Sequence, residues 1–282
     1  MKSLRPSLDL LSPMERFAIR VGEITNESEP LKRALTRYQR TFGAWWVHEA
    51  SKKAIDIRGL DRVRAVAPSR GVIVASNHRS FFDMYVTSSI LYRNVDWVDR
   101  LFFPVRSEFF YEGLTGLFVN AVIGGFAMYP PVFRSGEKRE LNNHFLSRTV
   151  AFLQRRGTVV GIHPEGTRGK GPDPYALLPA QPGAGRMIHA ARVPVIPVWT
   201  LGLTNNFLHQ VIRGVAGHAA PVTVVFGAPV YLDDFLAETG RPAIYKRVAD
   251  RVLDAIRALA NSTRNLSPVN EVPRAPAASA NS

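Results

Sequence analysis

Residues 77–83, which read NHRSFFD, contain a histidine and an aspartate whose types and spacing suit acid–base chemistry. They follow a short apolar run at 71–75 and precede a mainly apolar stretch of helical length at 84–91. We therefore expect His78 at a strand-to-helix turn. In open α/β sheets ligands bind beyond the carboxyl ends of the strands, where an imidazole can accept a proton from a hydroxyl group.

His78 and Asp83 can meet only if the histidine precedes the helix, because five residues correspond to about 500° of helical rotation. Ser80 favours this arrangement, since Ser80 and Asp83 have the spacing of an N-cap and an acidic residue at N3. The Asp83 carboxylate would then reach back to one ring nitrogen and leave the other free as a general base. The alternative is a capping aspartate beside a loop histidine that has no catalytic role.

A second motif, HPEGTR at residues 163–168, follows the strand-like run at 158–162. Proline and glycine bracket Glu165, and Arg168 follows at once, which predicts a tight loop with exposed amides and a guanidinium at a strand end. Such a loop suits an anion, because arginine binds phosphate in bidentate fashion and the amides add donors. Taken alone the motif is weak, since Gly-Thr-Arg also occurs in ordinary turns.

The two motifs and the run VPVIPV at 193–198, in this order and at these separations, resemble the glycerolipid acyltransferases of the lysophosphatidic acid acyltransferase type. The resemblance covers roughly residues 59–230. It implies that His78 deprotonates the acceptor hydroxyl for attack on an acyl thioester and that Asp83 orients the imidazole.

The resemblance also implies a set of residues that bind the phosphate of the acceptor. These are Glu165, Gly166, Thr167 and Arg168, with Arg106 and Arg134 as further candidates. The chain departs from the family pattern in three places: Arg134 comes late, after two prolines; Gln181 or Pro182 stands where relatives have lysine; and His163 stands where an aromatic residue is common. We expect a structural role for His163.

The implied reaction moves a fatty acyl group from acyl-CoA or acyl carrier protein to a lysophospholipid, with 1-acylglycerol 3-phosphate giving phosphatidic acid. The acyl thioester is a co-substrate, and no cofactor or metal is expected. One alternative is another acceptor, such as glycerol 3-phosphate, a lysocardiolipin or another alcohol. A second is a non-catalytic membrane lipid-binding protein, against which the intact pair His78 and Asp83 argues.

The amino-acid composition limits which classes of binding partner the chain can have. Cysteine is absent from the 282 residues, which excludes disulfides, a thiol nucleophile and thiolate metal sites. The formal charge of +13 calls for an anionic partner. Because zinc-finger, RNP1 and basic-zipper patterns are missing, we expect an anionic membrane surface and phosphorylated substrates and no nucleic acid. Residues 1–30 lack the order of a signal peptide, which favours the cytoplasm.

The chain divides into an amphipathic helical segment at 1–57, an α/β domain at 58–264 and a disordered tail at 265–282. The α/β domain is predicted as a mixed, largely parallel sheet flanked by helices. The expected strands are 72–75, 126–129, 158–162, 193–199 and 222–226, and the expected helices are 81–92, 138–155 and 184–192. Residues 112–134 carry no internal charge, but glycine and proline pairs divide them, so we expect buried core there.

The N-terminal segment combines an apolar stripe with basic residues on the opposite helix face. The stripe consists of Leu31, Leu35, Tyr38, Phe42 and Trp45, and the basic residues are Arg33, Arg37 and Arg40. This composition is typical of a helix that lies in a membrane interface. The alternative is a helix packed on the protein's own core. We expect peripheral attachment to the cytoplasmic face of an anionic membrane.

Overall fold

The computed structural model of the protein describes residues 8–51, 55–66, 68–204 and 221–266. From residue 267 onward the tail that was expected to be disordered lies outside the described residues, while residues 265 and 266 end the last helix. The described strands are β1 (Ile55–Arg58), β2 (Val72–Ser76), β3 (Arg100–Phe102), β4 (Val105–Arg106), β5 (Pro131–Val132), β6 (Thr158–Ile162), β7 (Val195–Leu201) and β8 (Val222–Phe226).

The described helices fall into an N-terminal, a middle and a C-terminal group. The first contains η1 (Leu8–Leu10), α1 (Pro13–Glu27), α2 (Glu29–Tyr38), the π-helix η2 (Gln39–Gly43) and α3 (Ala44–Ser51). The second contains α4 (Leu60–Ala65), α5 (Asp83–Asn94), α6 (Ser107–Phe110), α7 (Leu114–Val122), the 3-10 helix η3 (Gly136–Lys138) and α8 (Arg139–Leu153). The third contains α9 (Pro182–Ala191), α11 (Asp233–Leu236) and α12 (Pro242–Leu266).

The main sheet has six strands in the order β1-β8-β7-β2-β6-β3. Every neighbouring pair is parallel except β7 and β8, which confirms the predicted mixed, largely parallel sheet. The predicted strands at 72–75, 158–162 and 222–226 are β2, β6 and β8, whereas β7 begins two residues later than expected. β1 begins at Ile55, so the sheet includes the last residues of the segment that was expected to be helical.

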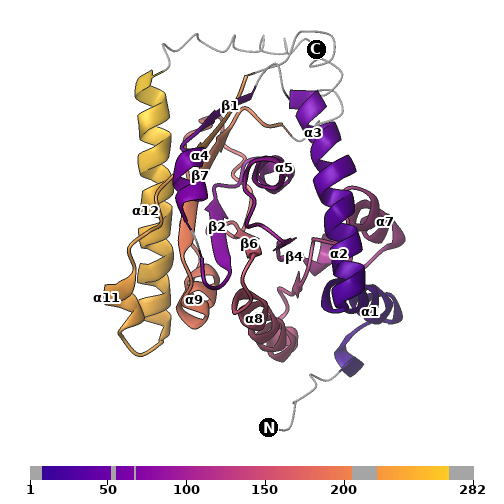
Figure 1. Cartoon of the computed structure of the whole chain (residues 1–282). Coiled ribbons are helices and arrows are strands. Elements are labelled where there is room, and N and C mark those ends of the chain that lie inside the picture. Colours follow the sequence, from indigo (N-terminus) through magenta and orange to yellow (C-terminus); the bar gives the residue numbers. More distant parts are fainter. Residues whose placement is uncertain (1–7, 52–54, 67, 205–220, 267–282) are drawn as a thin grey trace, which may run out of the picture.

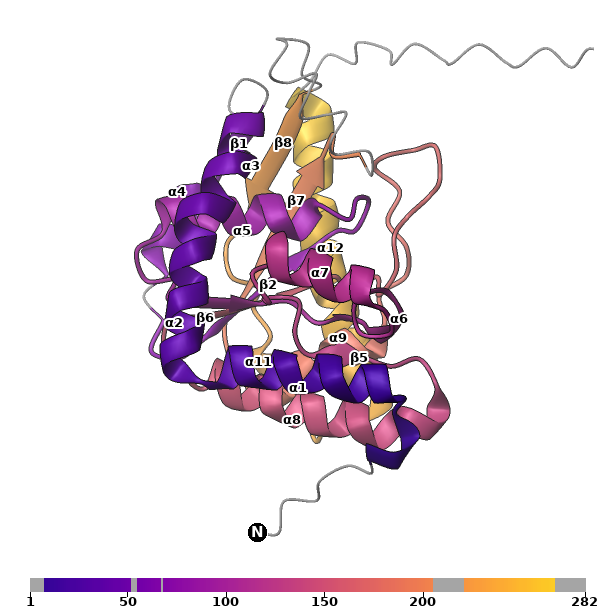
Figure 2. The same ribbon diagram turned by 90° about the vertical axis from the view of Figure 1, so that its right-hand side faces the viewer.

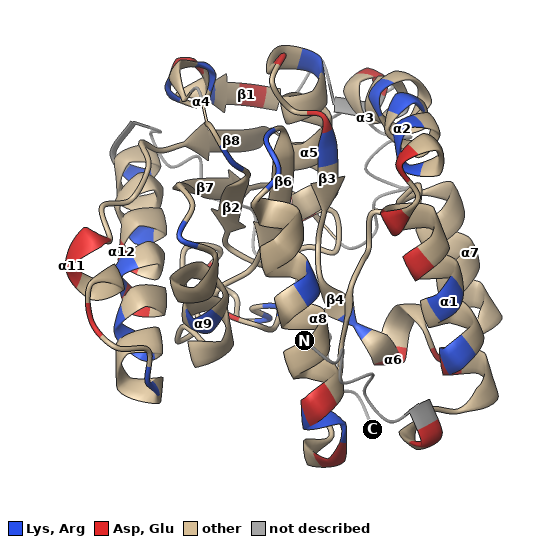
Figure 3. Cartoon of the chain, turned by 60° about the horizontal axis from the view of Figure 1, so that its bottom comes forward, with Lys and Arg blue, Asp and Glu red and all other residues tan. Residues whose placement is uncertain are grey.

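Helices cover both faces of this sheet (Figure 1). α8, α9 and α12 lie on one face, while α5 lies on the other with α3 packed against it (Figure 3). The strands β2, β6 and β7 run in the same direction, and all of their residues except Leu201 are buried. Their carboxyl ends therefore meet at one edge of the sheet, where His78, residues 163–168 and Thr200 come together.

The predicted strand at 126–129 is wrong, because the end of a turn and an irregular loop occupy these residues. Gly125 and Phe126 both have positive φ values, of 49° and 59°, which lie outside the β region of regular strands. The side chain of Asn120 binds the following backbone, with its Oδ1 accepting from Met128 N and its Nδ2 donating to Met128 O, both at 3.2 Å. These bonds replace a sheet ladder in this loop.

Residues 112–134 are only partly buried, which corrects the expectation of a core segment. Met128 and Tyr129 are fully buried, but Leu114, Phe118 and Val122 of α7 are exposed. The segment is divided, as the glycine and proline pairs indicated, into a helix of nine residues and a loop, but one side of that helix is exposed.

The N-terminal helices wrap around one side of the domain, with α1 lying below α7 and α2 continuing into η2 and α3 (Figure 2). The side of α2 and η2 that faces the domain is polar, because Lys32, Thr36 and Gln39 are buried. Lys32 Nζ donates to Asn26 Oδ1 at 2.8 Å and to Leu101 O at 3.0 Å. The apolar stripe of this segment is therefore not the surface by which the helices pack on their own domain.

Phe42 and Trp45 of the stripe are 50% and 53% exposed. Tyr38 is half-buried, and its hydroxyl donates to Val122 O. Of the basic residues, Arg40 turns onto the domain, where its guanidinium donates to Val98 O. No helix among the described residues is both long and apolar enough to cross a bilayer.

Candidate active site

The turn between β2 and α5 places His78 before the helix, as the spacing required. α5 begins at Asp83, two residues later than the start predicted at 81, because residues 81 and 82 form a turn. Ser80 nevertheless fixes this turn, since its Oγ accepts from Phe82 N at 3.1 Å and donates to Thr204 O at 2.8 Å. The helix start was predicted too early, whereas the reach of Asp83 back to Ser80 and His78 is present.

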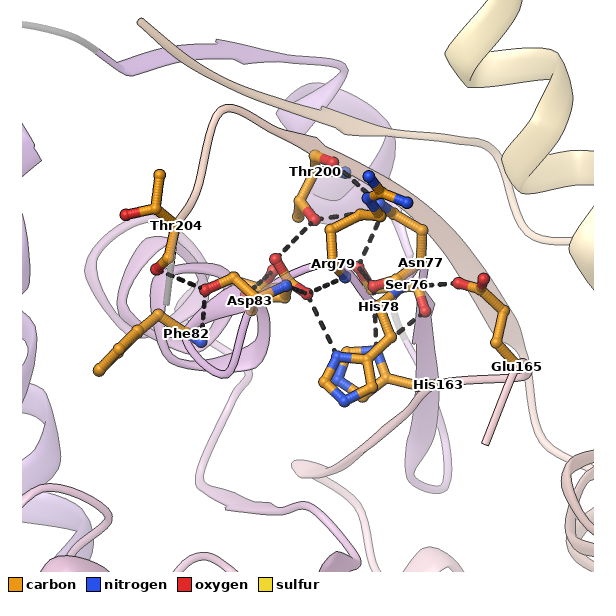
Figure 4. A network of polar contacts seen from close by, with 12 residues as sticks. Ser76, Asn77, His78, Arg79, Phe82, Asp83, His163, Glu165, Thr200 and Thr204 are labelled. Carbon is orange, nitrogen blue, oxygen red and sulfur yellow. Dashed lines mark hydrogen bonds and ion pairs between the residues drawn. The ribbon is translucent and has the colours of Figure 1, made fainter. Parts of the chain in front are cut away.

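Asp83 holds the imidazole of His78 through its Oδ2 atom, which lies 3.3 Å from His78 Nδ1 (Figure 4). The same oxygen accepts from the amides of Arg79 and Ser80, each at 2.8 Å. The side chain of Asp83 is 1% exposed. Because a carboxylate oxygen only accepts, Nδ1 of His78 carries the hydrogen and Nε2 keeps a free lone pair.

Asn77 and Thr200 tie the ends of β2 and β7 together beneath this pair. Asn77 Nδ2 donates to Thr200 O at 2.9 Å, and Asn77 Oδ1 accepts from Thr200 N at 2.7 Å. The Thr200 hydroxyl lies 3.2 Å from Asp83 Oδ1. All three side chains are buried, so the second oxygen of Asp83 also has a fixed partner.

His163, the residue after β6, stacks on His78 with ring centroids 3.9 Å apart and planes 7° apart. Its Nδ1 lies 3.0 Å from both Ser76 O and Asn77 O. Since carbonyl oxygens only accept, Nδ1 of His163 donates. The structural role that we expected for His163 thus consists of bracing the β2 turn and packing against the ring of His78.

The surroundings keep both imidazoles neutral. Burial, followed by the positive charges of Arg168 and Arg106, lowers the pKa of His78 to about 4. Burial and the neighbouring His78 lower the pKa of His163 to about 3. Burial raises the pKa of Asp83 to about 6, against the opposing effects of His163 and of the hydrogen bonds. At neutral pH the site therefore holds an unprotonated His78 beside an ionised Asp83.

Glu165 does not face the site, which corrects the expectation that it contacts the acceptor. Its Oε1 accepts from His78 N at 2.8 Å and its Oε2 accepts from Leu178 N at 2.6 Å, and the residue is 1% exposed. Both oxygens are thus occupied by backbone amides. Glu165 positions the backbone of His78 against the loop that follows β6.

A cavity of about 800 Å³ opens in front of the two histidines. Arg106, Gly166, Thr167 and Arg168, four of the residues that the resemblance implies for binding the acceptor phosphate, line this cavity. Arg106 Nη2 donates to Gly166 O at 2.9 Å, which joins β4 to the loop after β6. Among the described residues, none that lines the cavity is an aspartate or a glutamate, so the cavity favours an anionic ligand.

Arg134 is exposed and does not line the cavity. Its positive charge still reaches the site, since burial and the charges of Arg134 and Arg168 lower the pKa of Arg106. In this structure Arg134 therefore acts on the site through its charge and does not contact the cavity.

α8 and α9 form one wall of the cavity, which was not predicted from the sequence. Arg139, Asn142, Asn143 and Leu146 of α8 line the cavity at spacings of three, one and three, which mark one helix face. Arg186 of α9 lines it as well, and its Nη1 donates to Asn143 Oδ1 at 2.8 Å. The α8 spacing was visible in the sequence, but only the packing of α8 against α9 shows which side faces the site.

Apolar side chains form much of the remaining cavity wall. They include Phe81, Met84, Tyr85, Phe103, Phe109, Phe110, Val132, Phe145 and Met187. A basic region beside His78 and an apolar remainder suit an amphiphile with an anionic head group. Among the described residues, no group of three or more His, Cys, Asp or Glu is placed to hold a metal ion.

Comparison with known proteins agrees with this geometry. The profile of the family described as Acyltransferase matches residues 54–201, which are more than half of the 282 residues and include both motifs. No curated protein matches the chain. One solved structure that resembles it is the 1-acyl-sn-glycerophosphate (LPA) acyltransferase PlsC from Thermotoga maritima, with a TM-score of 0.50, 18% identity and 88% of each chain covered. At that identity the likeness concerns the fold.

Proposed function

The chain belongs to the acyltransferase family, and on that premise we propose that it transfers a fatty acyl group from an acyl thioester to a lysophospholipid hydroxyl, with 1-acylglycerol 3-phosphate as acceptor. The observation that carries the proposal is the cavity itself. It holds the imidazole of His78, the guanidinium groups of Arg106 and Arg168 and an apolar wall in one space. A phosphate, a hydroxyl and an acyl chain are the three parts of such an acceptor.

In the proposed reaction His78 Nε2 takes the proton from the acceptor hydroxyl as its oxygen attacks the thioester carbonyl. The new C–O ester bond forms, the C–S bond breaks, and the departing thiolate takes the proton from the imidazolium. Asp83 stabilises that imidazolium and keeps Nδ1 as a donor. A thioester is already activated, so positioning and one base suffice and no covalent acyl-enzyme is required.

Besides binding to Arg106 and Arg168, the acceptor phosphate should change the pKa of His78. In the empty site their charges help to hold the pKa of His78 at about 4, which makes the imidazole a weak base. A bound phosphate offsets those charges, so the pKa of His78 rises when the acceptor binds. The base is then better suited to neutral pH, because a general base is most effective when its pKa lies near the pH of the reaction.

An acceptor panel tests the proposal. Purified protein is incubated with labelled acyl-CoA or acyl carrier protein and with 1-acylglycerol 3-phosphate, glycerol 3-phosphate, a lysocardiolipin or a lysolipid without a phosphate monoester. We expect the largest kcat/KM for 1-acylglycerol 3-phosphate. Preference for a lysolipid without a phosphate monoester would contradict the role of Arg106 and Arg168.

The pH profile should show the depressed pKa of His78. Because protonation removes the base, kcat/KM should be constant near neutral pH and should fall only as pH drops from about 6 towards about 4, where first Asp83 and then His78 takes up a proton. Arg168→Gln should move this acid limb to higher pH, since loss of a neighbouring positive charge makes His78 easier to protonate. The measurement is kcat/KM from pH 4 to 8.

Arg186→Gln is the matched control, because Arg186 lines the same cavity but is not among the charges that lower the pKa of His78. It should leave the limb in place. The acceptor is the same in all proteins, so its own titration cancels in the comparison. A limb near the ordinary histidine pKa of about 6.5 in every protein would show that the arginines do not act on the base.

We also propose that α2, η2 and α3 dock the enzyme peripherally on an anionic membrane at the cytoplasmic face. The exposed rings of Phe42 and Trp45, together with the polar face that α2 turns to its own domain, support this proposal. Docking would let the acceptor enter the cavity without crossing water.

Phe42→Glu plus Trp45→Glu should weaken binding to anionic vesicles at least about 10-fold, because two aromatic rings that would insert into the bilayer are replaced by two negative charges. Cosedimentation with anionic and neutral vesicles measures the effect. Binding of the parent should also weaken as salt rises. Asn261→Glu plus Ser262→Glu, which adds the same charges at exposed sites of α12, is the control. Equal losses in the two double variants would mean that only net charge matters.

A further inference from the structure

α7 exposes a ridge of large apolar side chains, formed by Leu114, Phe118 and Val122. They are 72%, 66% and 43% exposed and recur every four residues, so they lie along one side of the helix. None of the nine residues of α7 is charged, and the helix is accordingly tan in Figure 3. A contiguous exposed apolar ridge of this kind marks an interaction surface.

At one end the ridge adjoins the cavity. Phe109 of α6 and Val132 of β5 both line the cavity and are exposed, at 57% and 41%. α6 packs directly against α7 and also contacts β5. The rim of the cavity on this side is thus apolar and continues onto the ridge.

At the other end the ridge is fastened to the N-terminal helices. Tyr38 donates through its hydroxyl to Val122 O at 2.7 Å, and Gln39 Nε2 donates to Gly124 O at 2.8 Å. The exposed rings of Phe42 and Trp45 follow in the same N-terminal segment. Three exposed apolar groups, on α2–α3, on α7 and at the cavity rim, therefore belong to one connected part of the molecule.

We infer that the α7 ridge inserts into the lipid bilayer beside α2 and α3, and that Phe109 and Val132 form the opening through which acyl chains pass between bilayer and cavity. The inference rests on the proposed lipid acceptor and adds a second inserting element to the proposed docking. The net charge of the chain favours a bilayer, and not a second copy of the chain, as the partner of the ridge. A chain with a net charge of +13 repels its own copies and is attracted to an anionic surface.

The absence of cysteine allows a direct test, since a single introduced cysteine can be labelled without background. Phe118→Cys carries an environment-sensitive fluorophore on the ridge, and Ser262→Cys carries it at an exposed position of α12 as the control. Vesicles contain phosphatidylglycerol and phosphatidylcholine, with or without a quencher-bearing lipid. We expect a blue-shifted emission that the quencher lipid suppresses at least about two-fold at position 118, and neither change at position 262.

Label at position 118 that stays in water while the protein cosediments with the vesicles would overturn the inference. So would the absence of any vesicle binding, or burial of the label in a dimer detected by sedimentation velocity without vesicles. Phe118→Asp, which should weaken vesicle binding at least about 10-fold, provides a second measurement without a label. Both variants are also assayed with detergent-dispersed acceptor, where no docking is needed. Normal acyl transfer there, combined with no insertion, would reject the inference and leave the proposed function intact.

Discussion

Replacement of His78 by alanine is expected to lower kcat for acyl transfer at least about 100-fold while the protein stays folded. The side chain lies at the cavity, and the turn that carries it is held by other groups. Its backbone amide donates to Glu165, and Asp83 keeps the amides of Arg79 and Ser80. The effect should therefore appear in kcat with little change in the melting temperature. Steady-state kinetics and thermal unfolding of the same preparation measure both.

Asp83→Asn separates orientation from charge. The amide oxygen can still accept from the two backbone amides, and its NH2 group can donate to the Thr200 hydroxyl that lies beside Oδ1. The imidazole stays oriented while the stabilising charge is lost, so we expect a smaller loss than for His78→Ala. Near-normal turnover of the His78 variant would exclude the imidazole as the base.

Arg168→Ala is expected to raise KM for 1-acylglycerol 3-phosphate about 10- to 100-fold, the usual range for a lost charge-assisted hydrogen bond, and to leave KM for the acyl donor nearly unchanged. The guanidinium lines the cavity near His78, and its charge acts on that imidazole. Initial rates with each substrate varied in turn give the two constants.

Arg168→Lys should recover only part of the loss, because an ammonium group lacks the planar fork. Arg139→Ala, on the α8 side of the same cavity, is the matched control and should change the acceptor KM less. If Arg168→Ala raised KM equally for donor and acceptor, the residue would hold the loop rather than the phosphate.

The buried strands could be predicted from the sequence because each is an unbroken run of mostly apolar residues. β6 and β8 match the runs 158–162 and 222–226 residue for residue, since strands covered on both faces consist mostly of apolar residues. β1 and β3 escaped prediction because they are four and three residues long, include charged side chains and lie at the edges of the sheet. The 25-residue helix α12, which packs on α9 and β7, was also missed.

In the site, too, the sequence predicted which residues take part better than it predicted where their side chains point. The contact between His78 and Asp83 could be predicted, because their spacing excludes a contact within one helix and the cap at Ser80 places the histidine before the helix. Sequence could not show that Glu165 points away from the cavity towards two backbone amides, or that Arg186 points into it. Those directions depend on how the loop after β6 folds back onto the β2 turn and how α9 packs against α8.

The most direct test of the account is the balance of products when the wild-type protein meets acyl-CoA and 1-acylglycerol 3-phosphate. Mass spectrometry of the lipids and a thiol assay would follow phosphatidic acid and free CoA in one time course, with intact-protein mass as a third readout. Direct transfer from the thioester to the acceptor predicts equal amounts of the ester and the thiol and no acyl adduct on the protein. Thiol released without ester, an acylated protein, or the absence of both products would contradict direct acyl transfer at His78.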